Sequence, residues 1–189
     1  MKEVCMDKNK IIRLIFRIVT TAACVFMLTF IFSNSLQTAE ASSAQSHTVV
    51  DTVQKVAAVI APESPIATAT GEAYDKLHSA IRIAAHFLEF AMLGALCCWC
   101  WYSYTDKKIF LLAPAAVIIA TPMIDELLQT LALGRASEFF DVCVDVAGGL
   151  SGGFFALCTL TIGICIYRKY QQKHKSGGGK SPSASQENG

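Results

Sequence analysis

Long apolar stretches alternate with polar segments along the chain, and four of them are long enough to cross a membrane. They run from Ile11 to Phe32, from about Ile81 to Tyr104, from Ile109 to about Leu131, and from about Phe139 to Tyr167. Even the shortest, of about 22 residues, would form a helix about 33 Å long, which exceeds the ~30 Å of a hydrocarbon core. The pattern predicts an all-α membrane protein with four transmembrane helices.

The polar segment between the first two apolar stretches, residues 33–80, is predicted to be an external loop. Within it, Val49, Val53, Val56 and Ile60 recur at helical spacing, which predicts a short amphipathic helix. Such a helix would lie either on the membrane surface or against the transmembrane helices. The sequence does not choose between these two positions.

The overall composition agrees with a membrane protein. Hydrophobic residues make up 53% of the chain and charged residues 16%, whereas a soluble domain carries about 25% charged residues. The net charge is +1, and we expect no nucleic-acid partner. Of the eight cysteines, none lies in residues 33–80, which argues against an extracellular disulfide framework. Cys97 and Cys100 form a C-x-x-C inside an apolar stretch, where small apolar helix residues are a simpler interpretation than a metal or redox pair.

Basic residues indicate how the chain is oriented in the membrane. If the amino terminus is cytoplasmic, 12 of the 16 Lys and Arg residues lie in or beside cytoplasmic segments, as the positive-inside rule expects. We therefore predict a multi-pass protein of the cell membrane with both termini in the cytoplasm. Residues 1–10 form the cytoplasmic amino terminus, residues 11–167 the membrane domain, and residues 168–189 a disordered cytoplasmic tail.

A cleaved signal peptide is the alternative to a retained first helix. Ala39-Glu40-Ala41 resembles a cleavage site. The apolar core of a signal peptide is only about 7–15 residues long, however, and the first apolar stretch is longer than that. We therefore favour a retained membrane anchor.

Two pairs of glycines lie four residues apart in the last apolar stretch, Gly148 with Gly152 and Gly149 with Gly153. This spacing lets helices approach closely in lipid. It supports a helix contact without identifying the partner, which is another helix of the chain or a second copy in a homo-oligomer.

Ionisable and polar residues gather near one end of the predicted helices. Arg82, His86 and Glu89 share one helix face, and so do Asp125 with Gln129 and Asp141 with Asp145. In the predicted topology, every one of these positions lies toward the outer face of the bilayer. A charged residue in a membrane helix costs about 2.5–3.5 kcal/mol on insertion scales, so we expect these side chains to face a shared interior.

This constellation suggests either a functional pocket or a set of structural ion pairs. His86, Glu89 and Asp125 are the candidate catalytic residues, because histidine titrates near neutrality and a buried carboxyl group can be shifted toward neutrality. The candidate binding residues are Arg82, Glu126, Gln129, Arg135, Asp141 and Asp145. In the structural alternative, Arg82–Glu89 and Arg135–Asp141 would be ion pairs that hold the helices together. One histidine with several carboxylates would also suit a metal, but no HExxH-type pair is present; we assign no metal ligand and identify no cofactor.

The same residues resemble those of the VanZ-like family of bacterial membrane proteins. The matching stretches are Phe32-Ser33 with Gln37 and the Ser-rich segment that follows, Arg82-x-x-x-His86-Phe87-x-Glu89-Phe90, Asp125-Glu126-x-x-Gln129, and Gly134-Arg135 followed by Asp141, Asp145 and Gly148. The resemblance covers roughly residues 11–153 and adds Ser33 and Gln37 to the candidate binding residues. It implies a protein of the bacterial cell envelope, and the namesake of the family is associated with low-level resistance to the glycopeptide teicoplanin. The insertion between Gln37 and Arg82 looks longer than in compact members.

These observations lead to one favoured function and two alternatives. We expect a pocket at the outer face that binds, with or without chemical modification, a membrane lipid or a lipid-linked envelope precursor. The first alternative is a non-enzymatic membrane protein that sequesters or excludes an antibiotic or assists envelope partners. A proton-coupled transporter is less favoured, because it needs ionisable groups through the middle of the membrane, and the inner halves of the predicted helices carry almost none.

Overall fold

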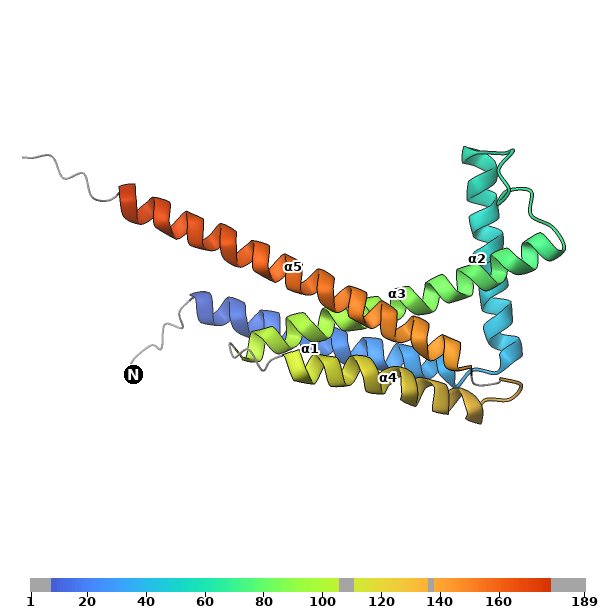
Figure 1. Ribbon diagram of the computed structural model, residues 1–189, viewed down its shortest axis with the longest axis horizontal. Coiled ribbons are helices and arrows are strands. Elements are labelled where there is room, and N and C mark those ends of the chain that lie inside the picture. Colours follow the sequence, from blue (N-terminus) through green and yellow to red (C-terminus); the bar gives the residue numbers. More distant parts are fainter. Residues whose placement is uncertain (1–7, 106–110, 136–137, 178–189) are drawn as a thin grey trace, which may run out of the picture. The chain divides into compact units, whose positions relative to one another are not determined.

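The structure, a computed structural model, describes residues 8–105, 111–135 and 138–177. This part of the chain contains five α-helices and no strand. They are α1 (Lys8–Ser35), α2 (Ala39–Ile60), α3 (Glu72–Tyr104), α4 (Leu112–Leu131) and α5 (Phe139–Gly177), shown in Figure 1. The chain divides into two compact units, residues 1–156 and residues 157–189. All the residues of the candidate site belong to the first unit.

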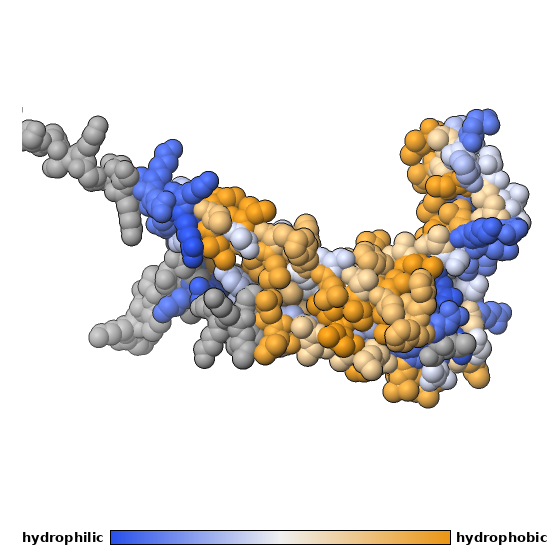
Figure 2. Space-filling view, in the orientation of Figure 1, coloured by the Kyte–Doolittle hydropathy of each residue, from blue (hydrophilic) through white to orange (hydrophobic). Residues whose placement is uncertain are grey.

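Four helices are long and apolar enough to cross a membrane, namely α1, α3, α4 and α5. This confirms the all-α fold with four candidate membrane helices and an additional helix between the first two. Figure 2 shows apolar residues over much of the surface of these helices and a mixture of hydrophilic and apolar residues on α2. The chain is therefore a multi-pass membrane protein.

Two helix boundaries differ by more than a few residues from those predicted from the sequence. Helix α3 begins at Glu72 rather than near Ile81, and α5 continues to Gly177 rather than ending near Tyr167. The start of the predicted disordered tail, residues 168–177, is therefore helical. The disorder predicted for residues 178–189 lies outside the described residues.

The apolar core of the first unit lies where α1 packs against α3. Met27 and Ile31 of α1 contact Phe90 and Leu93 of α3, and these four side chains are at most 5% exposed. Val117 of α4 packs against the same cluster. Met27 and Ile31 are four residues apart and so share one face of α1. That face continues one turn further to Ser35, which enters the polar site.

Glycines bring α5 unusually close to α3 and α4. A Cβ atom added at Gly148 or Gly152 would collide with the backbone of Phe87 or Ala91 of α3, and one added at Gly149 would meet Ile118 of α4 at 2.7 Å. The helix contact expected from the glycine spacing therefore lies within the chain. Because Asp145 lies three residues before Gly148, this close contact also holds Asp145 against α3.

Helix α2 lies across α3, as Figure 1 shows. The ring of His47 stacks on that of His78 with 4.3 Å between centroids, and its Nδ1 lies 3.0 Å from the hydroxyl of Tyr74. The Tyr74 hydroxyl donates a hydrogen bond to Asp51 of α2. Val50 is fully buried at this crossing. Helix α2 thus packs on α3 through part of its surface, whereas Val49, Val56 and Ile60 of the predicted apolar face remain exposed. Whether that face also lies on the membrane surface stays a prediction.

Candidate functional site

Asp125 of α4 is held from two sides. Its side chain is 1% exposed. The Ser35 hydroxyl of α1 donates a hydrogen bond to Oδ1, and the Gln129 amide, one turn further along α4, donates to Oδ2 at 2.9 Å. With a donor on each oxygen, the carboxyl group has one defined orientation. Ser35 and Gln129 are polar residues but are only 3% and 1% exposed. Their hydrogen bonds to Asp125 satisfy these polar groups within the core.

His86 of α3 and Asp145 of α5 face each other beside Asp125. His86 Nδ1 lies 3.6 Å from Asp145 Oδ1. One donor atom from each of His86, Asp125 and Asp145 lies within 4.8 Å of the other two. Asp145 is 1% exposed, and among the described residues neither His86 Nδ1 nor Asp145 Oδ1 has a hydrogen-bond partner. Three helices thus bring one imidazole and two carboxyl groups to a single point.

Two arginines lie nearer the surface than this cluster. The Arg82 guanidinium donates a hydrogen bond to Asp141 at 3.3 Å, and Arg82 is exposed while Asp141 is half-buried. Arg135, which follows α4, donates to the backbone carbonyl of Asn34 at 3.2 Å. Burial lowers the pKa of Arg135, but a guanidinium remains charged in proteins. Both arginines therefore bring positive charge to the site.

Glu126 has a different position from its neighbour Asp125. It is 6% exposed and accepts a hydrogen bond from the backbone N–H of Glu138, immediately before α5. A carboxylate favours the positive N-terminal end of a helix. Glu126 thus ties α4 to the start of α5 and supports the position of Asp145 indirectly.

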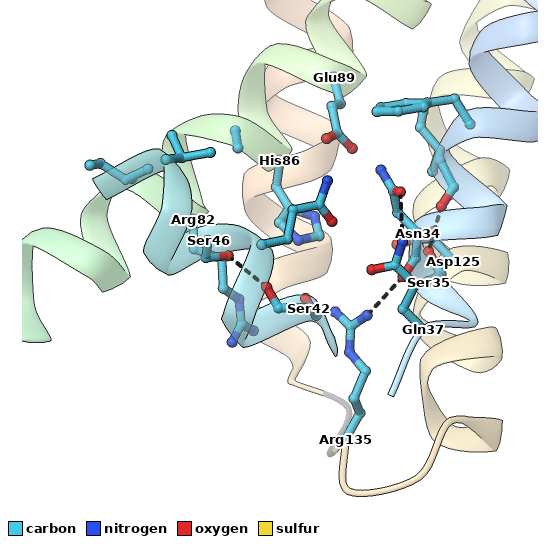
Figure 3. Close-up of a pocket in the computed structure, with 16 residues that line it drawn as sticks. Asn34, Ser35, Gln37, Ser42, Ser46, Arg82, His86, Glu89, Asp125 and Arg135 are labelled. Carbon is cyan, nitrogen blue, oxygen red and sulfur yellow. Dashed lines mark hydrogen bonds between the residues drawn. The ribbon is translucent and has the colours of Figure 1, made fainter. Parts of the chain in front are cut away.

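A partly open cavity of about 170 Å³ lies between α1, α2, α3, α4 and the segment after α4. His86, Glu89 and Asp125 line its inner part, and Arg82 and Arg135 line it nearer the surface. Ser42 and Ser46 of α2 form the wall opposite α1, and Figure 3 shows these groups around one space. A second cavity of about 170 Å³ shares Ser42, Ser46 and both arginines. The arginines and serines of the wall therefore face two adjoining spaces.

The structure brings together most of the residues singled out from the sequence. Gln37, Arg82, His86, Glu89, Asp125 and Arg135 line the first cavity. Asp141 and Asp145 adjoin it through Arg82 and His86, and Gln129 supports Asp125. Ser33 is exposed and does not line that cavity. Of the two structural ion pairs considered, the structure shows neither; Arg82 pairs with Asp141 instead.

Several polar residues of the site were not predicted from the sequence. They are Asn34, Ser35, Ser42, Gln45 and Ser46. The burial of Ser35 has a visible signal, because it continues the spacing of four from Met27 and Ile31. The serines of α2 have a weaker signal, because they lie in the Ser-rich segment after Gln37 that resembles the VanZ-like family. Their place at the cavity depends on the crossing of α2 over α3, which the sequence does not give.

The fold and the cavity define a multi-pass membrane protein with a polar pocket at one end of its apolar helices. A family model described as VanZ/LLP1 matches residues 20–163. The chain therefore belongs to the VanZ/LLP1 family, as its resemblance to VanZ-like proteins indicated. No curated protein and no solved structure gave a significant match.

Proposed function

We propose that the cavity binds the anionic head group of a membrane lipid or of a lipid-linked envelope precursor. The observation that carries this proposal is the pair of guanidinium groups, Arg82 and Arg135, on the walls of one cavity. Arginine forms strong, often paired hydrogen bonds with phosphate and carboxylate oxygens. On the α2 side, the hydroxyl of Ser42 adds a further donor, whereas the Ser46 hydroxyl donates its proton to the Ser42 backbone carbonyl and offers only its oxygen.

The size and surroundings of the cavity favour a head group rather than a whole molecule. Pockets for drug-sized ligands enclose about 300–1,000 Å³, and this cavity has about 170 Å³. Phe30 and Ile81 lie on its rim, and the flanking helices expose apolar side chains such as Leu88. A lipid could therefore keep its chains on this apolar surface while its head group enters the cavity.

The cellular setting of the proposal follows from the family and the basic-residue pattern. The protein would lie in the bacterial cell membrane with both termini cytoplasmic, and the pocket would open toward the outer leaflet. Glycopeptide antibiotics bind envelope precursors at the outer face of this membrane. Teicoplanin susceptibility is therefore the phenotype to measure in cells that carry variants of the pocket.

Binding of phosphate lipids to the purified full chain tests this function. The probes are a polyprenyl phosphate, phosphatidylglycerol and, as an uncharged lipid, diacylglycerol, each titrated into the protein in neutral detergent. A charge-assisted hydrogen bond contributes about 1.5–3 kcal/mol, so Arg135→Gln and Arg82→Gln should each weaken phosphate-lipid binding by about 10- to 150-fold.

Lys76→Gln is the matched control, because Lys76 is exposed on α3, pairs with Glu72 at 2.7 Å and lies outside the cavity. It should bind phosphate lipids like the unchanged protein. If both arginine variants also bind like the unchanged protein, or if diacylglycerol binds as tightly as the phosphate lipids, the head-group function is wrong.

A further inference from the structure

The cluster of His86, Asp125 and Asp145 has the composition and spacing of a metal-binding site. Two ligands bound at about 2.1 Å to one tetrahedral ion are about 3.4 Å apart. His86 Nδ1 and Asp145 Oδ1 are 3.6 Å apart, and the three donor atoms lie within 4.8 Å of one another. We propose that these three side chains bind one divalent transition-metal ion.

A second observation at the same place is a pair of buried polar atoms that make no hydrogen bond. Buried polar groups in proteins are nearly always hydrogen-bonded, yet His86 Nδ1 and Asp145 Oδ1 have no hydrogen-bond partner among the described residues. Asp145 is 1% exposed, and the two atoms face each other across a gap too wide for a hydrogen bond. An ion between them would satisfy both.

The surroundings of Asp125 resemble the outer shell of a metal site. Ligating carboxylates are usually fixed by hydrogen bonds from neighbouring groups, which orient them toward the ion. Ser35 and Gln129 supply these bonds to the two oxygens of Asp125. Each oxygen keeps a second lone pair that can bind an ion.

Charge balance also favours a cation at this point. Asp145 lies in the field of the carboxyl groups of Asp125, Asp141, Glu126 and Glu89. Of the two nearby arginines, Arg82 already pairs with Asp141, and Arg135 bonds the backbone of α1. Unpaired charges are costly to bury. A divalent ion with two carboxylates and a neutral imidazole forms a group of zero net charge.

The donor set indicates which ions fit. Imidazole suits zinc, iron and copper, while carboxylates suit magnesium, calcium and manganese. A site with both is suited to Zn²⁺ or Mn²⁺ and less suited to Mg²⁺, which prefers oxygen ligands and retains several waters. Three protein ligands leave at least one position open, and because His86 and Asp125 line the cavity, that position is accessible from it.

Metal binding to the purified full chain, without added lipid, tests the site independently of the head-group function. The protein in detergent is first treated with a chelator and then dialysed against Zn²⁺, Mn²⁺ or Mg²⁺ alone, and the bound metal is measured by mass spectrometry. We expect one Zn²⁺ or Mn²⁺ per chain and much weaker binding of Mg²⁺. Loss of an outer-shell partner costs about 10–100-fold in affinity, so loss of a ligand in Asp145→Asn or Asp125→Asn should cost more than about 100-fold.

Asp75→Asn is the matched control, because it removes the same charge from an exposed position near the start of α3, outside the cluster and both cavities. It should change the metal affinity only a few-fold. Size-exclusion chromatography of the metal-free variants shows whether each is folded. In His86→Gln, the electron paramagnetic resonance spectrum of bound Mn²⁺ should change, because a nitrogen ligand is lost. Failure of the unchanged protein to retain Zn²⁺ or Mn²⁺, or equal binding by Asp145→Asn, would overturn the proposal.

Discussion

The contact between Gly148 of α5 and Phe87 of α3 provides a direct test of how the site is assembled. Gly148→Ala would place a Cβ atom 3.1 Å from the carbonyl carbon and Cα of Phe87 and closer still to its carbonyl oxygen. Favourable separations between such carbon atoms are about 3.5–4.0 Å. Because backbone atoms cannot rotate away, α5 must retreat from α3 by roughly 0.5–1 Å.

This retreat should be measurable both in stability and at the site. Overpacking costs about 1–3 kcal/mol, and the better helix propensity of alanine returns at most about 1 kcal/mol. A net loss of about 2 kcal/mol corresponds to an unfolding midpoint about 4–8 °C lower in a chain of this size. Since Asp145 lies on the same helix as Gly148, the gap of 3.6 Å between His86 and Asp145 should also widen, and Zn²⁺ affinity should fall.

The assay compares apparent unfolding midpoints in detergent at one heating rate, because membrane proteins often unfold irreversibly. Gly163→Ala is the control on the same helix, where an added Cβ meets nothing within 4 Å. It should leave the midpoint unchanged or raise it slightly. Equal midpoints for Gly148→Ala and Gly163→Ala would show that α3 and α5 do not approach as closely as the structure indicates.

Two further predictions concern the support of Asp125 and the orientation in the membrane. Ser35→Ala removes a donor from buried Asp125 and should cost about 1–3 kcal/mol of stability, measured as a lower unfolding midpoint. The control Ser33→Ala, at an exposed position, should change stability by no more than about 0.5 kcal/mol. Similar losses in the two variants would contradict the role of Ser35 as a support of Asp125. Ala44→Cys on α2, in a background without the native cysteines, should react with a membrane-impermeant maleimide in intact cells, and labelling only after lysis would reverse the predicted orientation.

The helices could be predicted from the sequence because each apolar stretch is long and nearly free of charge. The start of α3 could not, because residues 72–80 are polar and extend the helix beyond the apolar stretch. The end of α5 was missed for the same reason, since its last residues are basic and polar. In both cases the helix continues into a segment whose composition alone resembles a loop.

The site was predictable only in part, because spacing along one helix says nothing about the rotation of its neighbours. Arg82 and His86 share a face of α3, as their spacing predicts. Which acid each one meets depends on how closely α5 approaches. The Gly148 contact brings Asp141 to Arg82 and Asp145 to His86. The sequence offered Glu89 as the partner of Arg82 only in the alternative in which these residues form structural ion pairs.

Depth within the site separates two kinds of chemistry. The exposed and half-buried groups are Arg82, Arg135 and the α2 serines, which suit an anion that arrives from the membrane surface. The buried groups are Asp125 and Asp145 with His86 beside them, which suit a cation held within the bundle. An anionic head group held by the arginines would therefore lie on the side of the cavity from which the ion can be reached. A protein that only excluded an antibiotic would have no need of buried carboxyl groups behind the arginines, so the cost of burying Asp125 and Asp145 favours a site that positions a ligand against an ion.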